Sequence, residues 1–168
     1  PDGTAVTRGR LINLDTGVGD VGGGGTLETY ISIENYVGGL GSESITGSSA
    51  NNVLTGGAGN NIINGLGGND TLNGGDGNDT LTAGAGDDDV NGGNGDDLIV
   101  FTTGGGHYYD NVDGGAGIDT IDGSAGSYAM TVNFLTGTLD GDGITKTISF
   151  VEIERIIVYG LATKPEKT

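Results

Sequence analysis

A nine-residue repeat in the middle of the chain restricts its fold more than any other feature. Cut into nines from Gly38, the sequence reads GGLGSESIT, GSSANNVLT, GGAGNNIIN, GLGGNDTLN, GGDGNDTLT, AGAGDDDVN and GGNGDDLIV. The four residues FTTG at 101–104 interrupt the phase, which resumes as GGHYYDNVD and GGAGIDTID. A repeat of fixed length is typical of a solenoid, in which each unit stacks on its neighbours.

The eighth position of every row is aliphatic. It holds Ile45, Leu54, Ile63, Leu72, Leu81, Val90, Ile99, Val112 and Ile121. Because strand side chains alternate between faces, the last three residues of each row predict a short strand whose middle side chain points inward. The first six residues, rich in glycine, predict a tight turn. Two rows then complete one coil of about eighteen residues, giving an all-β solenoid with two narrow parallel sheets.

The composition excludes several classes of protein. The chain has 168 residues, 38 of them glycine, and a formal charge of −17, with 23 acidic and 6 basic residues. All the basic residues lie outside 11–145, so the surface would repel a nucleic acid. The absence of cysteine excludes disulfides, and no apolar run is long enough to span a membrane. Such acidity favours disorder, but a disordered segment has no reason to keep the nine-residue register.

The sixth position of the rows is acidic or an amide. It holds Glu43, Asn52, Asn61, Asp70, Asp79, Asp88, Asp97, Asp110 and Asp119. In a coil of two rows, the predicted neighbours are Asp70 with Asp88 and Asp79 with Asp97 and, if the insertion loops out without changing phase, Asp88 with Asp110 and Asp97 with Asp119. Stacked carboxylates oppose folding when no basic residue lies between them. A divalent cation between them reverses the sign of that interaction.

The available donors favour calcium over other metals. Every candidate donor is an oxygen of a carboxylate, an Asn side chain or a backbone carbonyl, and calcium binds six to eight such oxygens in flexible geometry. Magnesium requires a near-ideal octahedron, and zinc prefers His and Cys, of which the chain has one and none. No twelve-residue EF-hand loop ending in Glu occurs between helices.

Rows such as GGDGNDTLT resemble G-G-x-G-x-D-x-U-x, the nonapeptide of RTX (repeats-in-toxin) proteins. This resemblance implies a right-handed parallel β-roll with calcium between successive turns. It also implies secretion from Gram-negative bacteria through a type I channel, with folding outside the cell. In the family pattern, the carbonyls of positions two and four join the sixth side chain as ligands. The implied ligands are the side chains of Asn61, Asp70, Asp79, Asp88, Asp97, Asp110 and Asp119, and the carbonyls of Leu66, Gly68, Gly75, Gly77, Gly84, Gly86, Gly93 and Gly95.

The departures from the family pattern affect the predicted number of ions. Glu43, Asn52 and Asn61 replace aspartate in the first three rows and predict weak or empty sites there. Tyr108 replaces a turn glycine, which puts the turn at 105–110 in doubt. We expect two calcium ions, at the first two aspartate pairs, and up to about four or five in all.

Two segments that flank the repeats resemble each other. INLDTG at 12–17 parallels VNFLTG at 132–137, and SIEN at 32–35 parallels EIER at 152–155. YISIENYV and ISFVEIERIIV read as strands, and similar I-E-N strands border RTX blocks. Because solenoids need atypical ends, both segments are interpreted as β caps. The expected domains are a cap at 1–37, a roll at 38–131 with its insertion at 101–104, a cap at 132–160 and a disordered tail at 161–168.

The resemblance favours a calcium-binding module of a larger secreted adhesin, toxin or exoenzyme. We expect it on the surface of a Gram-negative bacterium or outside it, as a monomer whose partners are calcium and the rest of its parent chain. The sequence contains neither H-E-x-x-H nor G-x-S-x-G, so catalysis is not expected in this fragment. The further acids Asp87, Asp89 and Asp96 are interpreted as surface charges.

A polysaccharide-binding role is the main alternative, because RTX-like repeats occur in secreted alginate epimerases. His107, Tyr108 and Tyr109 would be the contact residues, although packing over the insertion is the more ordinary interpretation. An ice-binding role would require a regular Thr/Asn ladder. Positions seven and nine of the rows are too irregular for one.

Overall fold

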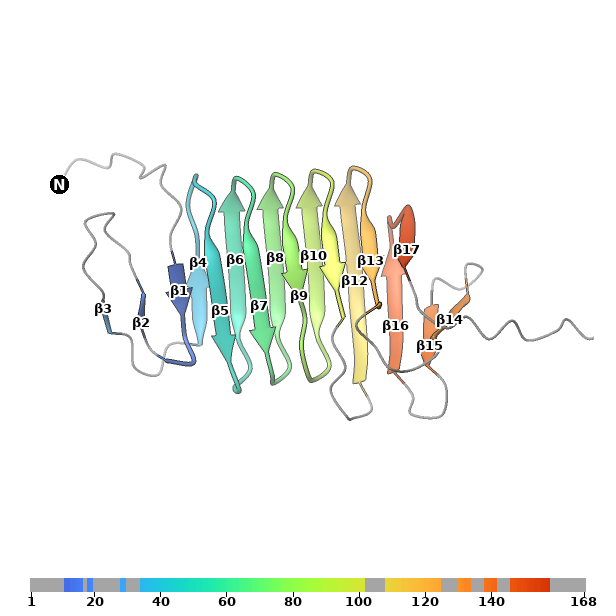
Figure 1. Ribbon diagram of the computed structural model, residues 1–168, viewed down its shortest axis with the longest axis horizontal. Helices are drawn as coiled ribbons and strands as arrows, with labels where there is room; N and C mark the ends of the chain where they lie inside the picture. Colours follow the sequence, from blue (N-terminus) through green and yellow to red (C-terminus); the bar gives the residue numbers. More distant parts are fainter. Residues whose placement is uncertain are drawn as a thin grey trace, which may run out of the picture.

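The architecture is that of an all-β solenoid. The computed structural model describes residues 11–16, 18–19, 28–29, 34–101, 108–124, 130–133, 138–141 and 146–157. Within these residues the regular elements are all strands, in one sheet of nine and one of eight, which together form about four turns (Figure 1). The predicted β-roll with two parallel sheets is therefore confirmed. Over the same residues there is no helix of the length and apolarity that a membrane crossing needs.

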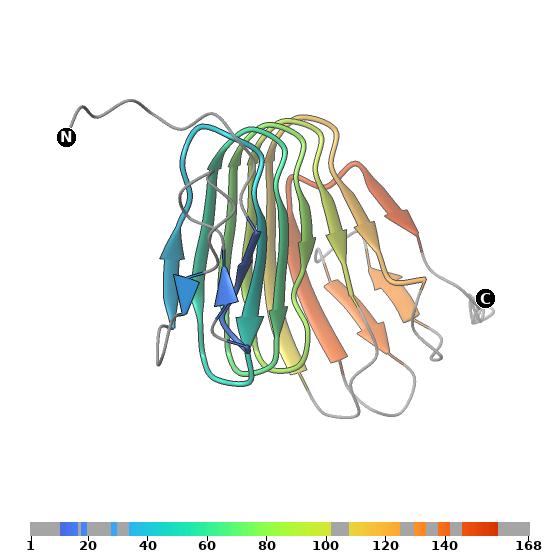
Figure 2. The same cartoon turned by 60° about the vertical axis from the view of Figure 1, so that its left-hand side comes forward.

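The chain passes alternately between the two sheets (Figure 2). The roll strands of the first sheet are β5 (Ser44–Ser48), β7 (Ile62–Leu66), β9 (Thr80–Thr82), β11 (Leu98–Val100) and β13 (Thr120–Asp122). Those of the second are β4 (Asn35–Val37), β6 (Val53–Ala58), β8 (Thr71–Asp76), β10 (Asp89–Asn94) and β12 (Tyr108–Ala116). Neighbours within a sheet are parallel and offset by one coil, as in the pairing of Leu72 with Val90.

Short antiparallel strands extend both ends of the roll (Figure 1). At the N-terminal end β1 (Leu11–Asn13), β2 (Val18–Gly19) and β3 (Glu28–Thr29) extend the first sheet. At the other end β14 (Met130–Asn133), β15 (Thr138–Gly141) and β16 (Lys146–Val151) extend the second sheet, and β17 (Arg155–Ile157) extends the first. The predicted continuous strand ISFVEIERIIV is thus wrong. It bends at Glu152, whose φ is 52°, because β16 and β17 belong to different sheets.

The core consists of two ladders of eighth-position side chains. All nine are buried, with 0–3% of their surface exposed, so the predicted inward orientation is confirmed. Each side chain pairs in register with its equivalent one coil away, as Ile63 does with Leu81 and Leu81 with Ile99. Ile12, Phe101 and Ala83 are buried in the same cluster. The core is therefore only one aliphatic layer thick on each side.

Several turns are shorter than the predicted six residues, although the segment 83–88 between β9 and β10 keeps that length. In the second sheet, β8 and β10 continue through the first three positions of the following row. The glycines there pair closely from coil to coil, as Gly75 does with Gly93, so the glycine-rich segment extends the sheet as well as turning it. The turn at 105–110, which Tyr108 put in doubt, is absent from its described part, because Tyr108–Asp110 forms the start of β12. Residues 102–107 lie outside the described part of the chain.

The sheets keep their register across the insertion. Val90 of β10 pairs with Val112 of β12, and Ile99 of β11 pairs with Ile121 of β13, although each pair is separated by 22 residues rather than 18. The extra residues therefore do not change the phase of the roll, as the conditional prediction required.

Leu66 is expected to destabilise the roll. Its φ is 73°, whereas the equivalent positions of the coils on either side are Ser48 and Gly84, of which Gly84 has φ 111°. A side chain with Cβ in this left-handed region costs about 1–2 kcal/mol. Leu66→Gly should therefore raise the free energy of unfolding by about 0.5–1 kcal/mol, after the larger entropy of glycine in the unfolded chain is subtracted. Urea denaturation at fixed calcium measures this, and Leu66→Ala, which keeps the Cβ, should give no gain.

Candidate metal centre

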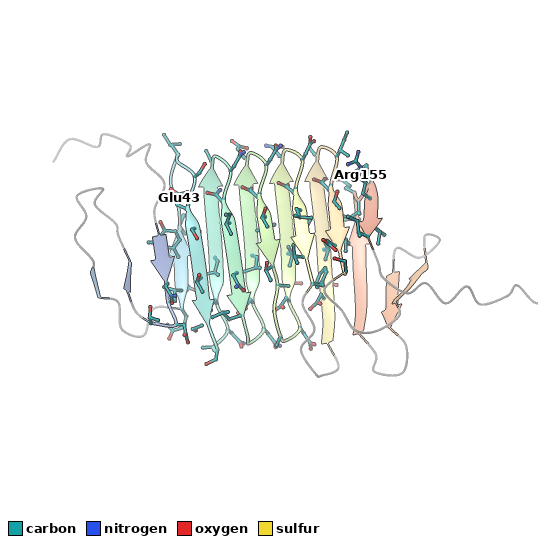
Figure 3. The ribbon with its side chains drawn as sticks, viewed as in Figure 1. Glu43 and Arg155 are labelled. Atoms are coloured by element: carbon teal, nitrogen blue, oxygen red, sulfur yellow. The ribbon has the colours of Figure 1, made fainter. Side chains whose placement is uncertain are left out.

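The nine sixth-position side chains form a buried polar layer next to the core. Each is 0–3% exposed, although every one is charged or an amide. Figure 3 shows side chains of the roll from end to end, with Glu43 near its beginning and Arg155 near its end. Each sixth residue except Asp110, which lies within β12, directly precedes a strand, so the strand that buries the eighth side chain also fixes the sixth. Burial of so many polar groups requires partners for each of them.

One oxygen of these side chains accepts a backbone hydrogen bond from the preceding coil. The donor is the sixth-position N–H one coil earlier, at N···O distances of 2.7–3.0 Å. The acceptors are Asn61, Asp70, Asp79, Asp88, Asp97, Asp110 and Asp119. The four predicted aspartate pairs are thus adjacent in the structure, including the two that span the insertion.

A second ladder runs in the opposite direction through the fifth position of the rows. Here the side-chain oxygen accepts the N–H of the following coil, as Asn60 does from Asn78 at 3.0 Å and Asn78 from Asp96 at 3.1 Å. The edge with Asn51, Asn69 and Asp87 repeats this arrangement. The acids interpreted as surface charges are exposed, but Asp96 also accepts the N–H of Ile118 and Asp89 accepts the amide of Asn111. The recurrence of Asn and Asp at position five was the sequence signal for this ladder.

The second carboxylate oxygen of four sixth-position aspartates differs from most buried polar atoms in proteins, which are hydrogen-bonded. The Oδ2 atoms of Asp70, Asp79, Asp97 and Asp119 are buried and have no hydrogen-bond partner among the described residues. A buried acceptor left in this way costs about 1–3 kcal/mol, and more when it is charged. Four such atoms in one layer indicate that a group of positive charge belongs beside them.

The contacts of Asn61 Nδ2 show what surrounds the atom that is equivalent to Oδ2 of the aspartates. Its Nδ2 donates to the carbonyls of Gly59 at 3.1 Å and Gly74 at 3.4 Å. In the next coil Asp79 places Oδ2 where Asn61 has Nδ2, since a Cβ on Gly56 would meet Asn61 Nδ2 and the carbonyl of Gly74, and a Cβ on Gly74 would meet Asp79 Oδ2 and the carbonyl of Gly92 in the same way. The aspartate therefore directs an acceptor toward carbonyls that an amide would satisfy. Oxygens facing one another in this way require a cation or a proton between them.

Side chains alone do not complete a metal site. In the part of the chain that the structure covers, no three His, Cys, Asp or Glu side chains converge on one point. Any ion must take much of its coordination from backbone carbonyls, which suits calcium with its preference for many oxygens in flexible geometry. The residues present fit that requirement, because the predicted carbonyl donors lie in the glycine-rich segments that join the strands, three of them near the ends of β7, β8 and β10 and the others in the turns. Their φ values are all in the left-handed region, at Leu66, Gly68, Gly75, Gly77, Gly84, Gly86, Gly93 and Gly95.

A model of a known protein family matches the repeats that form this layer. The model of the RTX calcium-binding nonapeptide repeat, in four copies, matches residues 37–72, 64–99 and 108–127. The repeat region belongs to the RTX calcium-binding repeat family. The chain has no significant match among curated proteins. The RTX region coincides with the roll strands from β4 to β13, and the repeats of this family bind calcium.

The two residues considered for a polysaccharide remain a prediction. His107 lies outside the described residues, and Tyr109 belongs to β12, where its side chain is not described. Ala83 is a feature that the sequence analysis overlooked. It is buried at the first position of a row whose equivalents Gly65, Gly74 and Gly92 leave no room for a Cβ.

Burial raises the pKa of four aspartates in this layer. Burial raises the pKa of Asp70 to about 7, with a smaller contribution from the charge of Asp88, against the opposing hydrogen bond from Asn52. Burial likewise raises the pKa of Asp79 and of Asp97 to about 6, and raises the pKa of Asp119. Protonation near neutral pH is the alternative to a cation for these carboxylates.

The stability of the calcium-free fold should therefore fall as the pH rises. The folded state binds more protons than the unfolded state between pH 3.8 and about 7, because the carboxyl pKa values are raised. The stabilising effect of this protonation is complete below about pH 4 and is lost as pH rises through about 6–7. Circular dichroism in chelator across this range measures it. A calcium-free fold that gains stability from pH 4 to 7 would contradict the assigned environment.

Gly74→Ala should damage the aspartate layer. The new Cβ would lie 2.3 Å from Oδ2 of Asp79 and 2.5 Å from the carbonyl of Gly92, so both oxygens must move. We expect a loss of about 1–3 kcal/mol of folding free energy and weaker calcium binding. Gly67→Ala is the matched control, because its Cβ would meet only the carbonyl of Ala85, at 3.7 Å. Calorimetric calcium titration of both variants provides the comparison, and equal losses would contradict the prediction.

Proposed function

We propose that this chain is a calcium-dependent folding module of a larger secreted protein. The observation that carries the proposal is the row of buried carboxylate oxygens at Asp70, Asp79, Asp97 and Asp119, directed at carbonyls in a segment without a basic residue. Where calcium is scarce, these charges oppose closure of the roll. Where calcium is abundant, the same charges favour it, so the ion acts as a switch for folding.

The chain's own groups prepare each site before an ion binds. The amide of the preceding coil holds Oδ1 and thereby leaves Oδ2 directed toward the carbonyls, as at Asp79, whose Oδ1 is held by Asn61. Bound calcium would supply the positive charge that lets these oxygens face one another. With calcium at about ten times its dissociation constant, binding stabilises the fold by about 1.4 kcal/mol per site.

The proposed sites lie at the pairs Asp70/Asp88 and Asp79/Asp97, with further ions at the pairs that reach Asp110 and Asp119. Asn61 is a poor candidate for a ligand, although the sequence analysis included it. Its Oδ1 accepts the N–H of Glu43 and its Nδ2 donates to carbonyls, so its row is satisfied without a metal. The N-terminal coils are therefore proposed to fold with little calcium, and the aspartate coils to require it.

The family supports the wider setting of this proposal. RTX repeats are typical of proteins secreted by Gram-negative bacteria, where the cell interior is poor in calcium and the exterior rich in it. A calcium-dependent roll would remain unfolded during export and become rigid outside, to the benefit of an attached adhesin, toxin or exoenzyme. The polysaccharide-binding alternative depends on His107 and Tyr109, and no contact of the described residues favours it.

A calcium titration monitored by far-UV circular dichroism tests the proposal. From chelator to millimolar calcium, we expect a cooperative gain of β signal, and no such gain with magnesium. A chain that is already fully folded in chelator at neutral pH would overturn the proposal.

Asp79→Asn separates the effect of the buried carboxylate from that of net charge. We expect it to fold more readily than the parent chain in chelator, because its Nδ2 can donate as Asn61 does. In calcium it should be stabilised less, by about 1.4 kcal/mol at tenfold excess over the dissociation constant. Asp89→Asn is the control, since it removes the same charge from an exposed side chain. Equal responses of the two variants to calcium would show that only net charge matters.

A further inference from the structure

The segments that flank the roll are two copies of one structural unit, 120 residues apart. The N-terminal unit comprises β1–β4 and the C-terminal unit β14–β17; each is an antiparallel meander of three strands followed by a fourth strand. The paired residues are Asn13 with Val18 and Val18 with Thr29 in the first, and Asn133 with Thr138 and Thr138 with Ser149 in the second. Every pairing described within the N-terminal unit thus has its equivalent in the C-terminal unit at an offset of 120 residues.

The two units contact the roll through opposite edges. In the N-terminal unit the first strand, β1, pairs with β5, and the fourth, β4, pairs with β6. In the C-terminal unit the third strand, β16, pairs with β12, and the fourth, β17, pairs with β13. Strand β1 pairs with the roll, whereas its equivalent β14 is the last strand of its sheet. Likewise β16 pairs with the roll, whereas its equivalent β3 is the last strand of its sheet (Figure 1).

The equivalent glutamates Glu34 and Glu154 each show half of one bonding pattern. Inside the roll, a sixth-position residue such as Asp70 accepts the preceding coil's N–H with its side chain and the following coil's N–H, from Asp89, with its carbonyl. Glu154 makes the backward contact, because its Oε2 accepts the N–H of Asp119 at 2.7 Å. Glu34 makes the forward contact, because its carbonyl accepts the N–H of Val53 at 3.0 Å. Together the two copies reproduce a complete internal rung of the solenoid.

The core ladders also continue through the unit in both directions. Tyr36 of β4 packs in register on Leu54 of the roll that follows it, while its equivalent Ile156 of β17 packs on Ile121 of the roll that precedes it. Ile12, only 1% exposed, forms the first rung of the other ladder opposite Ile45. Its equivalent on the terminal strand β14 is Val132, which is also aliphatic.

We propose that this unit is a two-sided connector between β-rolls, and that β14 and β17 of the C-terminal copy bind a second RTX roll as β1 and β4 bind this one. The second sheet of one roll would continue through the meander into the first sheet of the next roll. The fourth strand would join the first sheet of the preceding roll to the second sheet of the next. Thr131, Val132 and Asn133 would lie opposite the last three residues of a repeat row. This explains why β14, an edge of the kind that ordinarily invites aggregation, is the last strand of its sheet among the described residues.

A tandem chain in which residues 38–157 occur twice tests the connector at saturating calcium. It joins Ile157 to a second Gly38, which matches the natural junction of Val37 with Gly38 because Val37 and Ile157 are equivalent residues. We measure amide hydrogen exchange of residues 130–133, which occur in a middle and a terminal unit of the same molecule. Docking should slow exchange in the middle unit by at least about tenfold, so the peptide should give two mass envelopes of equal intensity.

A single, unprotected envelope would overturn the proposal, because the two rolls would then be joined without contact. It would also be overturned if the single-roll chain protected residues 130–133 at high concentration and lost that protection on dilution, since β14 would then pair with another molecule. Val132→Asp in the middle unit replaces the equivalent of the buried Ile12 and should abolish the protected envelope, whereas Asn133→Asp replaces the equivalent of the half-buried Asn13 and should retain it. The readout compares units at one calcium concentration, so failure of the calcium switch and failure of the connector are distinguishable.

Discussion

The hydrogen bond from a sixth-position amide to the side chain one coil later is the interaction on which the roll depends. It holds the turns together where the sheets end, in seven consecutive rows from Asn61 to Asp119. The fifth-position ladder opposes it in direction, so each turn is bonded to both neighbouring coils. Because these bonds require the side chain to be buried, they also create the polar layer in which a carboxylate has one oxygen bonded and the other exposed to carbonyls.

Whether the sixth position holds Asn or Asp determines whether the side chain is satisfied by hydrogen bonds alone or needs a cation or a proton. Asn61 uses both of its polar atoms in hydrogen bonds, so its own side chain needs no metal. Asp79 keeps the amide bond but replaces the donor with an acceptor, so its coil becomes unfavourable until a cation or a proton is present. The two residues have nearly the same shape and the same backbone setting. On the proposed function, the difference between a coil that needs calcium and one that does not lies in a single atom per row.

The coil could be predicted from the nine-residue period, but the turn lengths, the bend at Glu152 and the fifth-position ladder could not. The eighth and sixth positions recur strictly, so the inward ladder at Leu72 and Leu81 and the stacking of Asp70 with Asp88 followed from the sequence. The turn length did not, because glycine permits both a turn and the close strand pairing of Gly75 with Gly93. The bend at Glu152 was missed because a β-rich run does not indicate a change of sheet. The fifth-position ladder was missed because Asn and Asp are ordinary in turns.

A solenoid whose contacts run from coil to coil is insensitive to the distance along the chain between partners. Asp110 meets Asp88 after 22 residues with the same geometry that Asp88 shows with Asp70 after 18. Glu154 meets Asp119 after 35 residues through a different strand arrangement, and its carboxylate still accepts the same kind of bond. An insertion or a flanking unit is therefore tolerated when the residues that follow it pair in register with the preceding coil. Stability then propagates between nearest neighbours, and a cation bound at one rung favours the adjacent coil because that coil's amide holds the ligand in place.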